Sequence, residues 1–304
     1  MFFEVAVTGI RSVHRFEYKA PASLDEALNI LGASNTDARV LAGGTDLILQ
    51  MKQGQVCSSL VLDIKGVTEL NRLEWSEPDG LHIGAAVSLT KLLTFDAILE
   101  HYPILAQACS VIGSVQVRNR GTMGGNICNA APSADTAPSL MCLGAKAVIA
   151  SSNGTRTVDL NDFFVAPGKT TIRDDELLVV IKVPTPAIPS AGYYLRHTTR
   201  EEMDIAVASV ASFLTLSPNN ETVDKAHIAL GAVAPRPVRA YEAESFLTGK
   251  SVTADIIEEV AEKTAAEASP ISDIRGSYEY RREIVKVLTR RTLRESCTRL
   301  GLKV

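Results

Sequence analysis

The segment Val40-Leu41-Ala42-Gly43-Gly44-Thr45-Asp46-Leu47 decides how this chain is expected to fold. An apolar strand over 39–42 runs into two glycines, and we expect Thr45 to cap a helix that continues to about residue 53. Because glycine has no Cβ, the backbone at Gly43 and Gly44 can come close to a ligand. The free N–H groups at a helix start favour a phosphate group. A plain turn between a strand and a helix explains the same letters, so this segment alone leaves both interpretations open.

A second glycine-rich segment, RNRGTMGGNICNAAPSAD, occupies residues 118–135. Three glycines stand among short side chains that form hydrogen bonds. The wider stretch 113–139 has no long apolar run, and we expect it to be a binding loop between firm elements. The chain can lie flat against a planar or phosphorylated ligand and offer it many donors and acceptors, namely Thr122, Asn126, Asn129, Ser133 and Asp135. The alternative is a glycine-rich loop in which Asp135 only caps the following helix.

The remaining elements alternate between strands and helices, and then separate into a small sheet followed by helices. Three prolines within 184–189 predict a linker. Before it we expect helices over 24–31 with Ser23 as N-cap, over 88–100 and from Pro103, and strands over 60–64, 81–85, 145–150, 155–158 and 176–183. After it we expect strands over 205–216 and 225–233 and helices over 240–247, 254–267 and 278–300.

Composition and charge are those of an ordinary soluble globular protein. The 304 residues are 46% hydrophobic and 22% charged, with a formal net charge of −4. No basic run suits nucleic acid, no apolar run reaches the roughly 20 residues of a membrane span, and residues 1–10 lack the features of a signal peptide. We therefore expect a cytoplasmic protein with no membrane span and no nucleic-acid partner.

The cysteines do not predict a metal site. The chain has five cysteines, an odd number with no CxxC spacing. This pattern is not typical of a disulfide framework, a local zinc site or an iron–sulfur site. We therefore expect no metal ligands in this chain.

The two glycine segments together resemble the FAD-binding medium subunit of the xanthine dehydrogenase and carbon monoxide dehydrogenase family, the molybdenum hydroxylases. The segments MDIA at 203–206 and SPISDIRGSYEYRREIVKVLTRR at 269–291 are similar to the same family. The resemblance implies an α+β fold. An N-terminal extension over 1–15 would precede a p-cresol methylhydroxylase-type FAD-binding domain over 16–188, with subdomains over about 16–68 and 69–188. A flavoprotein C-terminal domain over 189–304, a small antiparallel sheet plus helices, would follow.

The resemblance also implies which residues bind FAD. Residues 40–47 would cradle the pyrophosphate, 122–126 would line the second face, and Asp135 would bond the cofactor. Arg196 stands where many relatives carry a lysine, and Ile205 stands where some place a tyrosine over the flavin ring. The full expected set is Val40, Leu41, Ala42, Gly43, Gly44, Thr45, Asp46, Leu47, Ile112 near the adenine end or ring edge, Thr122, Met123, Gly124, Gly125, Asn126, Asp135, Leu178 packed on the cofactor, Arg196 and Ile205.

The function implied by the resemblance is electron transfer, with no catalytic residue in this chain. The molybdenum pterin and the [2Fe–2S] clusters would lie on a large and a small partner subunit, in a dimer of heterotrimers. Electrons would pass through FAD to an acceptor such as NAD. The alternatives are a self-sufficient flavin oxidase of the same fold, and an assembly protein that has lost FAD, which the intact glycine pairs oppose. The charged helix over 278–294 is interpreted as a solvated face, with a subunit contact as the alternative.

Overall fold

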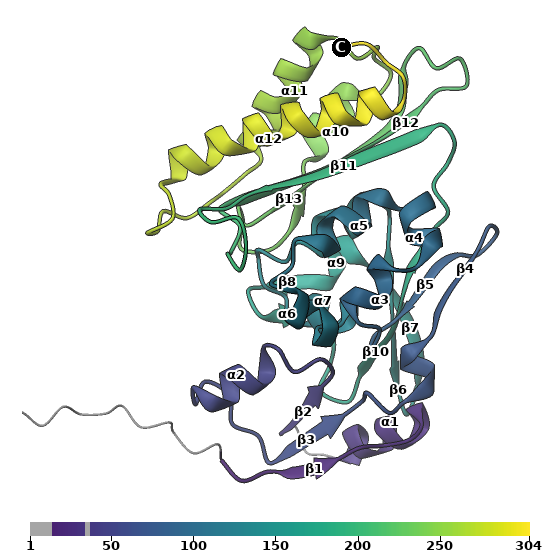
Figure 1. Ribbon diagram of the computed structural model, residues 1–304, viewed down its shortest axis with the longest axis vertical. Coiled ribbons are helices and arrows are strands. Elements are labelled where there is room, and N and C mark those ends of the chain that lie inside the picture. Colours follow the sequence, from purple (N-terminus) through teal and green to yellow (C-terminus); the bar gives the residue numbers. More distant parts are fainter. Residues whose placement is uncertain (1–13, 34–36) are drawn as a thin grey trace, which may run out of the picture.

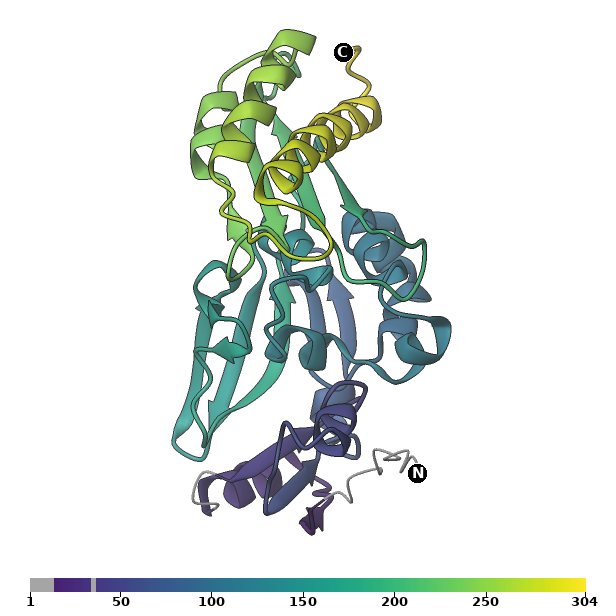
Figure 2. The same ribbon diagram turned by 90° about the vertical axis from the view of Figure 1, so that its left-hand side faces the viewer.

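The three larger β-sheets of the described residues follow one another along the long axis of the molecule (Figure 1). The structure is a computed structural model and describes residues 14–33 and 37–304. The view turned by 90° places the N-terminal sheet and the C-terminal helices at opposite ends (Figure 2). The mixed fold, with a small antiparallel sheet and helices at its C-terminal end, confirms the expected α+β class. The extension expected over 1–15 lies almost wholly outside the described residues, and the expected domain limits stay predictions.

The N-terminal sheet is parallel and has three strands in the order β1 (Glu17–Lys19), β3 (Leu60–Asp63), β2 (Ala38–Leu41). Helices α1 (Leu24–Ala33) and α2 (Leu47–Lys52) connect its strands, and the 3-10 turn η1 (Thr68–Asn71) leaves it. The Ser23 hydroxyl accepts the N–H of Glu26, which confirms the expected cap of α1.

The middle sheet is antiparallel, and helices cover it. Its order is β4 (Leu73–Ser76), β5 (Gly80–Gly84), β10 (Leu177–Val183), β6 (Lys146–Ser151), β7 (Gly154–Asp159). The elements around it are α3 (Leu89–Leu93), α4 (Asp96–His101), α5 (Pro103–Ser110), α6 (Val115–Arg120), α7 (Met123–Cys128), α8 (Thr136–Cys142), α9 (Leu160–Phe163) and the short hairpin of β8 (Phe164–Ala166) and β9 (Lys169–Thr170).

The C-terminal sheet is antiparallel in the order β11 (Ser190–His197), β12 (Ala208–Leu216), β13 (Val223–Gly231), β14 (Val238–Arg239). Helices α10 (Tyr241–Leu247), α11 (Ala254–Ala266) and α12 (Tyr278–Arg299) follow, and α12 lies across β11 and β12. In the part of the chain that the structure describes, no helix combines the length and the apolar character needed to cross a membrane.

The structure corrects four local expectations. The expected loop 113–139 holds α6, α7 and α8, which are too short to show a helical repeat in the sequence. The expected helix over 88–100 is split into α3 and α4, because Phe95 is extended. Helix α2 begins after Asp46 without a side-chain cap, since the Thr45 hydroxyl contacts the Asp46 carboxylate at 3.4 Å. Strand β11 was not expected, because it follows the proline-rich linker directly and opens with small residues.

The middle sheet and the C-terminal sheet share one apolar core. The cluster that joins β5, β6 and β10 to the helices of the middle region also contains Tyr194, Ala211 and Ala229 from β11, β12 and β13. One separate apolar cluster packs against the N-terminal sheet, and another lies between the C-terminal sheet and its helices. The C-terminal sheet is therefore a structural part of the middle region's core.

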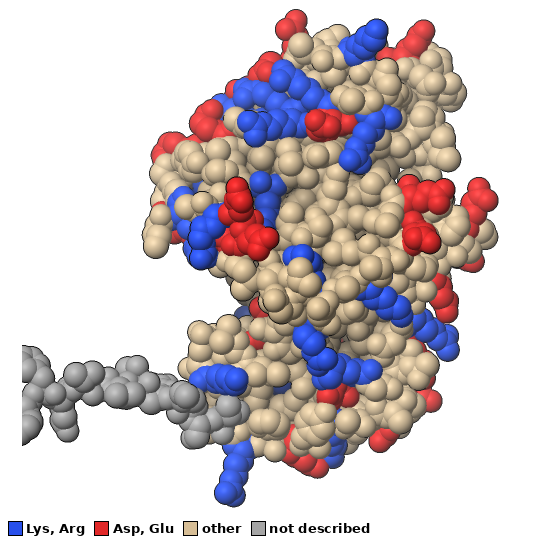
Figure 3. Space-filling view, viewed as in Figure 1, with Lys and Arg blue, Asp and Glu red and all other residues tan. Residues whose placement is uncertain are grey.

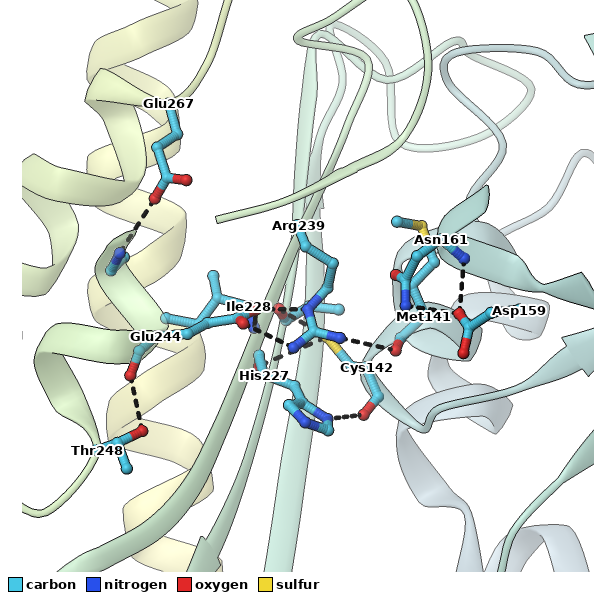
Figure 4. A network of polar contacts seen from close by, with 12 residues as sticks. Met141, Cys142, Asp159, Asn161, His227, Ile228, Arg239, Glu244, Thr248 and Glu267 are labelled. Atoms are coloured by element: carbon cyan, nitrogen blue, oxygen red, sulfur yellow. Dashed lines mark hydrogen bonds and ion pairs between the residues drawn. The ribbon is translucent and has the colours of Figure 1, made fainter. Parts of the chain in front are cut away.

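A buried polar network also connects the middle region to the C-terminal sheet and its helices (Figure 4). Arg239 of β14 forms an ion pair with Glu244 of α10, and each side chain is 8% exposed. Arg239 also donates to the carbonyl of Met141 at 3.5 Å, at the end of α8. Burial lowers the pKa of His227, whose ring Nδ1 lies 2.6 Å from the Cys142 carbonyl. Side chains of the C-terminal domain thus bind backbone groups of the middle region.

Candidate functional site

The structure brings the two glycine segments into contact. A Cβ placed on Gly43 would lie 2.1 Å from the carbonyl oxygen of Arg120 and 2.8 Å from the Cα of Gly121. Gly44 has a φ of +76°, a conformation that favours glycine. The close approach expected at these glycines therefore exists, and its partner is the backbone that leads into the second segment.

The loop after β2 presents backbone donors that have no partner among the residues the structure describes. The N–H groups of residues 43–46 have no hydrogen-bond acceptor in the described chain. Consecutive free N–H groups in a turn form a site that suits an anion. The surface is indented on the side of the molecule where α2 and α6 lie, between the N-terminal part and the middle region (Figure 3).

The second segment uses most of its backbone donors within the protein. The N–H of Met123 donates to Val87 at 3.0 Å, that of Gly124 to Ala85 at 3.1 Å, and that of Gly125 to the Thr122 hydroxyl at 3.0 Å. The N–H groups of these three residues are therefore not available to a ligand, and hydrogen bonds from the side chains of this segment to a ligand stay a prediction. Gly124 is needed for packing instead, because a Cβ there would lie 2.5 Å from the Ala85 carbonyl.

A buried acidic residue lies beside this segment and is held by the C-terminal sheet. One oxygen of Asp135 accepts the Tyr194 hydroxyl at 2.6 Å, and the other accepts the Arg196 guanidinium at 3.0 Å. Burial raises the pKa of the Asp135 carboxyl, and the charge of Arg196 opposes that rise. Burial also raises the pKa of Tyr194 well above its ordinary value, so the phenol keeps its proton. Asp135 makes no side-chain cap to α8, so the capping alternative is wrong.

Tyr194 is a member of this cluster that the sequence did not reveal. It lies in the unexpected strand β11, and its acidic partner is 59 positions earlier in the chain. Because the contact among Asp135, Tyr194 and Arg196 joins distant segments, these residues do not form a motif with a recognisable spacing in the sequence. Only the strand pattern that places Tyr194 and Arg196 on one face of β11 gives a signal, and the preceding prolines obscured it.

The other expected cofactor residues lie in different environments. Ile112 is half-buried, and its carbonyl accepts the Arg118 guanidinium at 2.9 Å. Leu178 is 2% exposed within the core, whereas Ile205 is 50% exposed before β12. Asp204, next to it, accepts the backbone N–H of Arg200 at 2.9 Å. The cofactor contacts of all the residues expected from the sequence stay predictions.

Two family models cover almost the whole chain. The model of the FAD binding domain in molybdopterin dehydrogenase matches residues 14–186, and the model of the CO dehydrogenase flavoprotein C-terminal domain matches 193–296. Among the residues with described positions, no group of three or more His, Cys, Asp or Glu side chains is arranged to hold a metal ion.

Two proteins are similar to this chain over nearly their full length. The glyceraldehyde dehydrogenase medium chain of Sulfolobus acidocaldarius is 36% identical over 280 residues, which are 92% of this chain and 98% of that protein. The putative xanthine dehydrogenase FAD-binding subunit of Escherichia coli is 32% identical over 94% of this chain and 98% of its own length.

A solved structure shows the same fold. A carbon monoxide dehydrogenase chain from Hydrogenophaga pseudoflava superposes with a TM-score of 0.90 at 32% identity, covering 94% of this chain and 98% of that one. The two matched family models, the similar FAD-binding chains and this superposition agree with one another. The chain therefore belongs to the family of FAD-binding medium subunits of molybdenum-containing dehydrogenases, and it is an oxidoreductase subunit.

Proposed function

We propose that this chain carries electrons from [2Fe–2S] clusters on a partner subunit, through its own FAD, to a soluble acceptor such as NAD. The observation that carries the proposal is the row of N–H groups over residues 43–46 that have no acceptor among the described residues, next to the packed second glycine segment, in a chain of this family. Substrate oxidation would take place on another subunit, which would carry the molybdenum cofactor.

The residues present fit FAD. The free N–H groups of residues 43–46 would bind the pyrophosphate, since backbone donors in a turn suit phosphate oxygens. Thr122 to Asn126 would form the second wall, with Gly124 packed on Ala85 to fix its position. The FAD itself supplies the redox chemistry, and the protein binds it, orients it and adjusts its potential.

The proposed assembly contains a large molybdenum-cofactor subunit and a small [2Fe–2S] subunit, as a dimer of heterotrimers in the cytoplasm. Relatives carry names that support a multi-subunit complex, such as the carbon monoxide dehydrogenase medium chain of Hydrogenophaga pseudoflava, which is 33% identical. The cofactor set of this assembly is the one implied by the family resemblance.

Acid precipitation of the purified chain tests the cofactor. We expect release of FAD at one molecule per chain, and no stoichiometric molybdenum, iron or zinc in elemental analysis of the isolated chain. The native preparation should contain two further subunits of the kinds named above. A colourless protein, or release of FMN alone, contradicts FAD binding. A stable monomer with full dehydrogenase activity favours a self-sufficient flavin oxidase.

Reoxidation of the substrate-reduced complex tests the acceptor. Ile205 is half-exposed and has no aromatic ring, so in the place over the flavin that the family resemblance implies it would leave room for a flat nicotinamide. We expect NAD⁺ to reoxidise the FAD in a stopped-flow experiment. Ile205→Tyr should slow this step about tenfold, equivalent to about 1.4 kcal/mol in the barrier, and slow an artificial dye much less. Ile205→Leu is the matched control. If only a quinone or a ferredoxin reoxidises the FAD, the acceptor is wrong and the relay role remains.

A further inference from the structure

A groove lies between helix α12 and strand β11 of the C-terminal sheet. It is lined by Arg291, Arg294 and Glu295 of the helix and by Tyr193 and Leu195 of the strand, and its volume is about 410 Å³. Strand β11 is an edge strand, because it stands at one end of the sheet order β11-β12-β13-β14. The groove therefore has one charged wall from the helix and one aromatic and aliphatic wall from the strand.

The charged wall of this groove has an excess of positive charge. Among the described residues Arg291 and Glu295 form no ion pair, and Arg294 reaches Glu258 only at 3.7 Å, with both side chains about half exposed. Figure 3 shows Lys and Arg side chains gathered over α12 on this face of the molecule. The guanidinium groups of Arg291 and Arg294 are therefore available to carboxylates from outside the chain.

Arg299 adds a third positive charge, which is held beside the groove. Its guanidinium lies 4.7 Å from the ring centroid of Tyr193 and donates to the Gly192 carbonyl at 3.3 Å. From Arg291 to Arg294 and on to Arg299 the helix rises by about 4.5 and 7.5 Å, at about 1.5 Å per residue. These steps are close to the spacing of about 6.6 Å between alternate residues of an extended chain. The three arginines therefore suit an extended segment with acidic residues at alternate positions.

The outer edge of β11 has backbone groups that can pair with such a segment. The Gly192 carbonyl accepts from Arg299, and the Tyr194 N–H donates to the Gln107 side chain at 3.0 Å, so alternate residues of this strand direct their backbone groups away from β12. In the described part of the chain, the Tyr194 carbonyl and both backbone groups of Arg196 have no hydrogen-bond partner. An open strand edge binds an extended segment by adding it as a further strand.

We propose that the groove between α12 and β11 binds an extended acidic segment of a partner subunit, whose carboxylates contact the three arginines and whose backbone pairs with β11. The inference rests on the proposed function, because the partner is a subunit of the proposed assembly. Nucleic acid fits this groove less well, since the net charge of −4 repels a polyanion and Glu295 interrupts the row of positive charges. A peptide can also place apolar side chains on Tyr193 and Leu195.

A short fluorescent peptide of alternating glutamate and valine tests the groove by anisotropy with the purified chain. We expect this peptide to bind, and the same peptide with lysine in place of glutamate not to bind. Arg291→Glu/Arg294→Glu should weaken binding about tenfold, because two attractive contacts become repulsive. Arg291→Lys/Arg294→Lys should retain most of the affinity, and added salt should weaken binding to the wild type. Both positions are exposed on α12, so the variants should fold.

The matched control is Lys169→Glu/Lys225→Glu. It changes the net charge by the same amount as Arg291→Glu/Arg294→Glu, at two exposed positions outside the groove, on β9 and β13. Peptide affinity should stay within twofold of wild type in this control. In the native complex, the arginine variant should lose its partner subunits at a lower sodium chloride concentration than either the wild type or the control, as measured by gel filtration.

Several results would overturn the inference. They are wild-type affinity no greater for the glutamate peptide than for the lysine peptide, equal losses in the arginine variant and the lysine control, and tighter binding of an oligothymidylate than of the glutamate peptide. Partner subunits retained equally by the wild type and the arginine variant would also overturn it, while the proposed function stands. A wild-type chain that is purified without FAD would instead contradict the proposed function itself.

Discussion

A Gly43→Ala chain should be purified with less than about a tenth of the wild-type FAD. The added Cβ would lie 2.1 Å from the Arg120 carbonyl oxygen, and a backbone atom cannot move aside as a flexible side chain can. The loop over 43–46 must then shift away from the second segment, at a cost of about 1–3 kcal/mol typical of overpacking. The absorbance ratio of flavin to protein in the purified chain measures the loss.

Gly32→Ala is the matched control for this substitution. Gly32 lies within α1, and its Cβ would meet only the Ser152 hydroxyl at 3.5 Å. FAD content should be unchanged and stability should rise by up to about 1 kcal/mol, since alanine favours a helix. Wild-type FAD content in Gly43→Ala would show that contact between the two glycine segments is not needed for binding.

Gly44→Val and Gly124→Val should also yield apoprotein, for different reasons. Gly44 has a left-handed backbone that a branched residue does not tolerate, and Gly124 packs against the Ala85 backbone. From the sequence, loss of FAD is expected at both positions because the new side chain would occupy the space of the cofactor. In the structure the reason is the backbone conformation at Gly44 and the packing against Ala85 at Gly124.

Glu244→Ala should destabilise the chain by about 3–5 kcal/mol, because it leaves the Arg239 charge buried without its partner. It also removes a hydrogen bond, because the backbone N–H of Ile228 donates to the Glu244 carboxylate at 2.7 Å. The midpoint of urea unfolding, followed by circular dichroism with FAD bound, measures the effect. The control is Glu258→Ala, which removes a surface partner of Arg290 and should cost less than about 1 kcal/mol.

The double variant Arg239→Met/Glu244→Gln tests the physical cause. It removes both charges and keeps an acceptor for Ile228, so most of the lost stability should return. If the double variant is as unstable as Glu244→Ala, loss of packing rather than an unpaired charge explains the result. Equal effects of Glu244→Ala and Glu258→Ala would mean that the buried pair contributes no more than a surface one.

The sequence predicts those parts of the fold that depend on local patterns. Long elements such as α11 and α12 carry a helical repeat and capping residues, Thr253 and Ser277, that each accept a backbone N–H. The short helices α6 to α8 lack such a repeat, and the strand pattern of β11 is hard to recognise because it follows directly on a proline-rich segment. The two glycine segments are visible in the sequence, but the contact of Gly43 with Arg120 is not, because it depends on how two distant segments pack. Tyr194 is missed for the same reason.

The core shared by the middle and C-terminal sheets limits how such proteins can recombine. Tyr194, Ala211 and Ala229 complete an apolar cluster whose other members come from the preceding domain. Exchange of the C-terminal domain between two relatives at the linker would bring together surfaces that were never selected to fit. The match of α5 and α8 with the face of β11 to β13 must therefore be inherited as a unit, although two family models divide the chain between them.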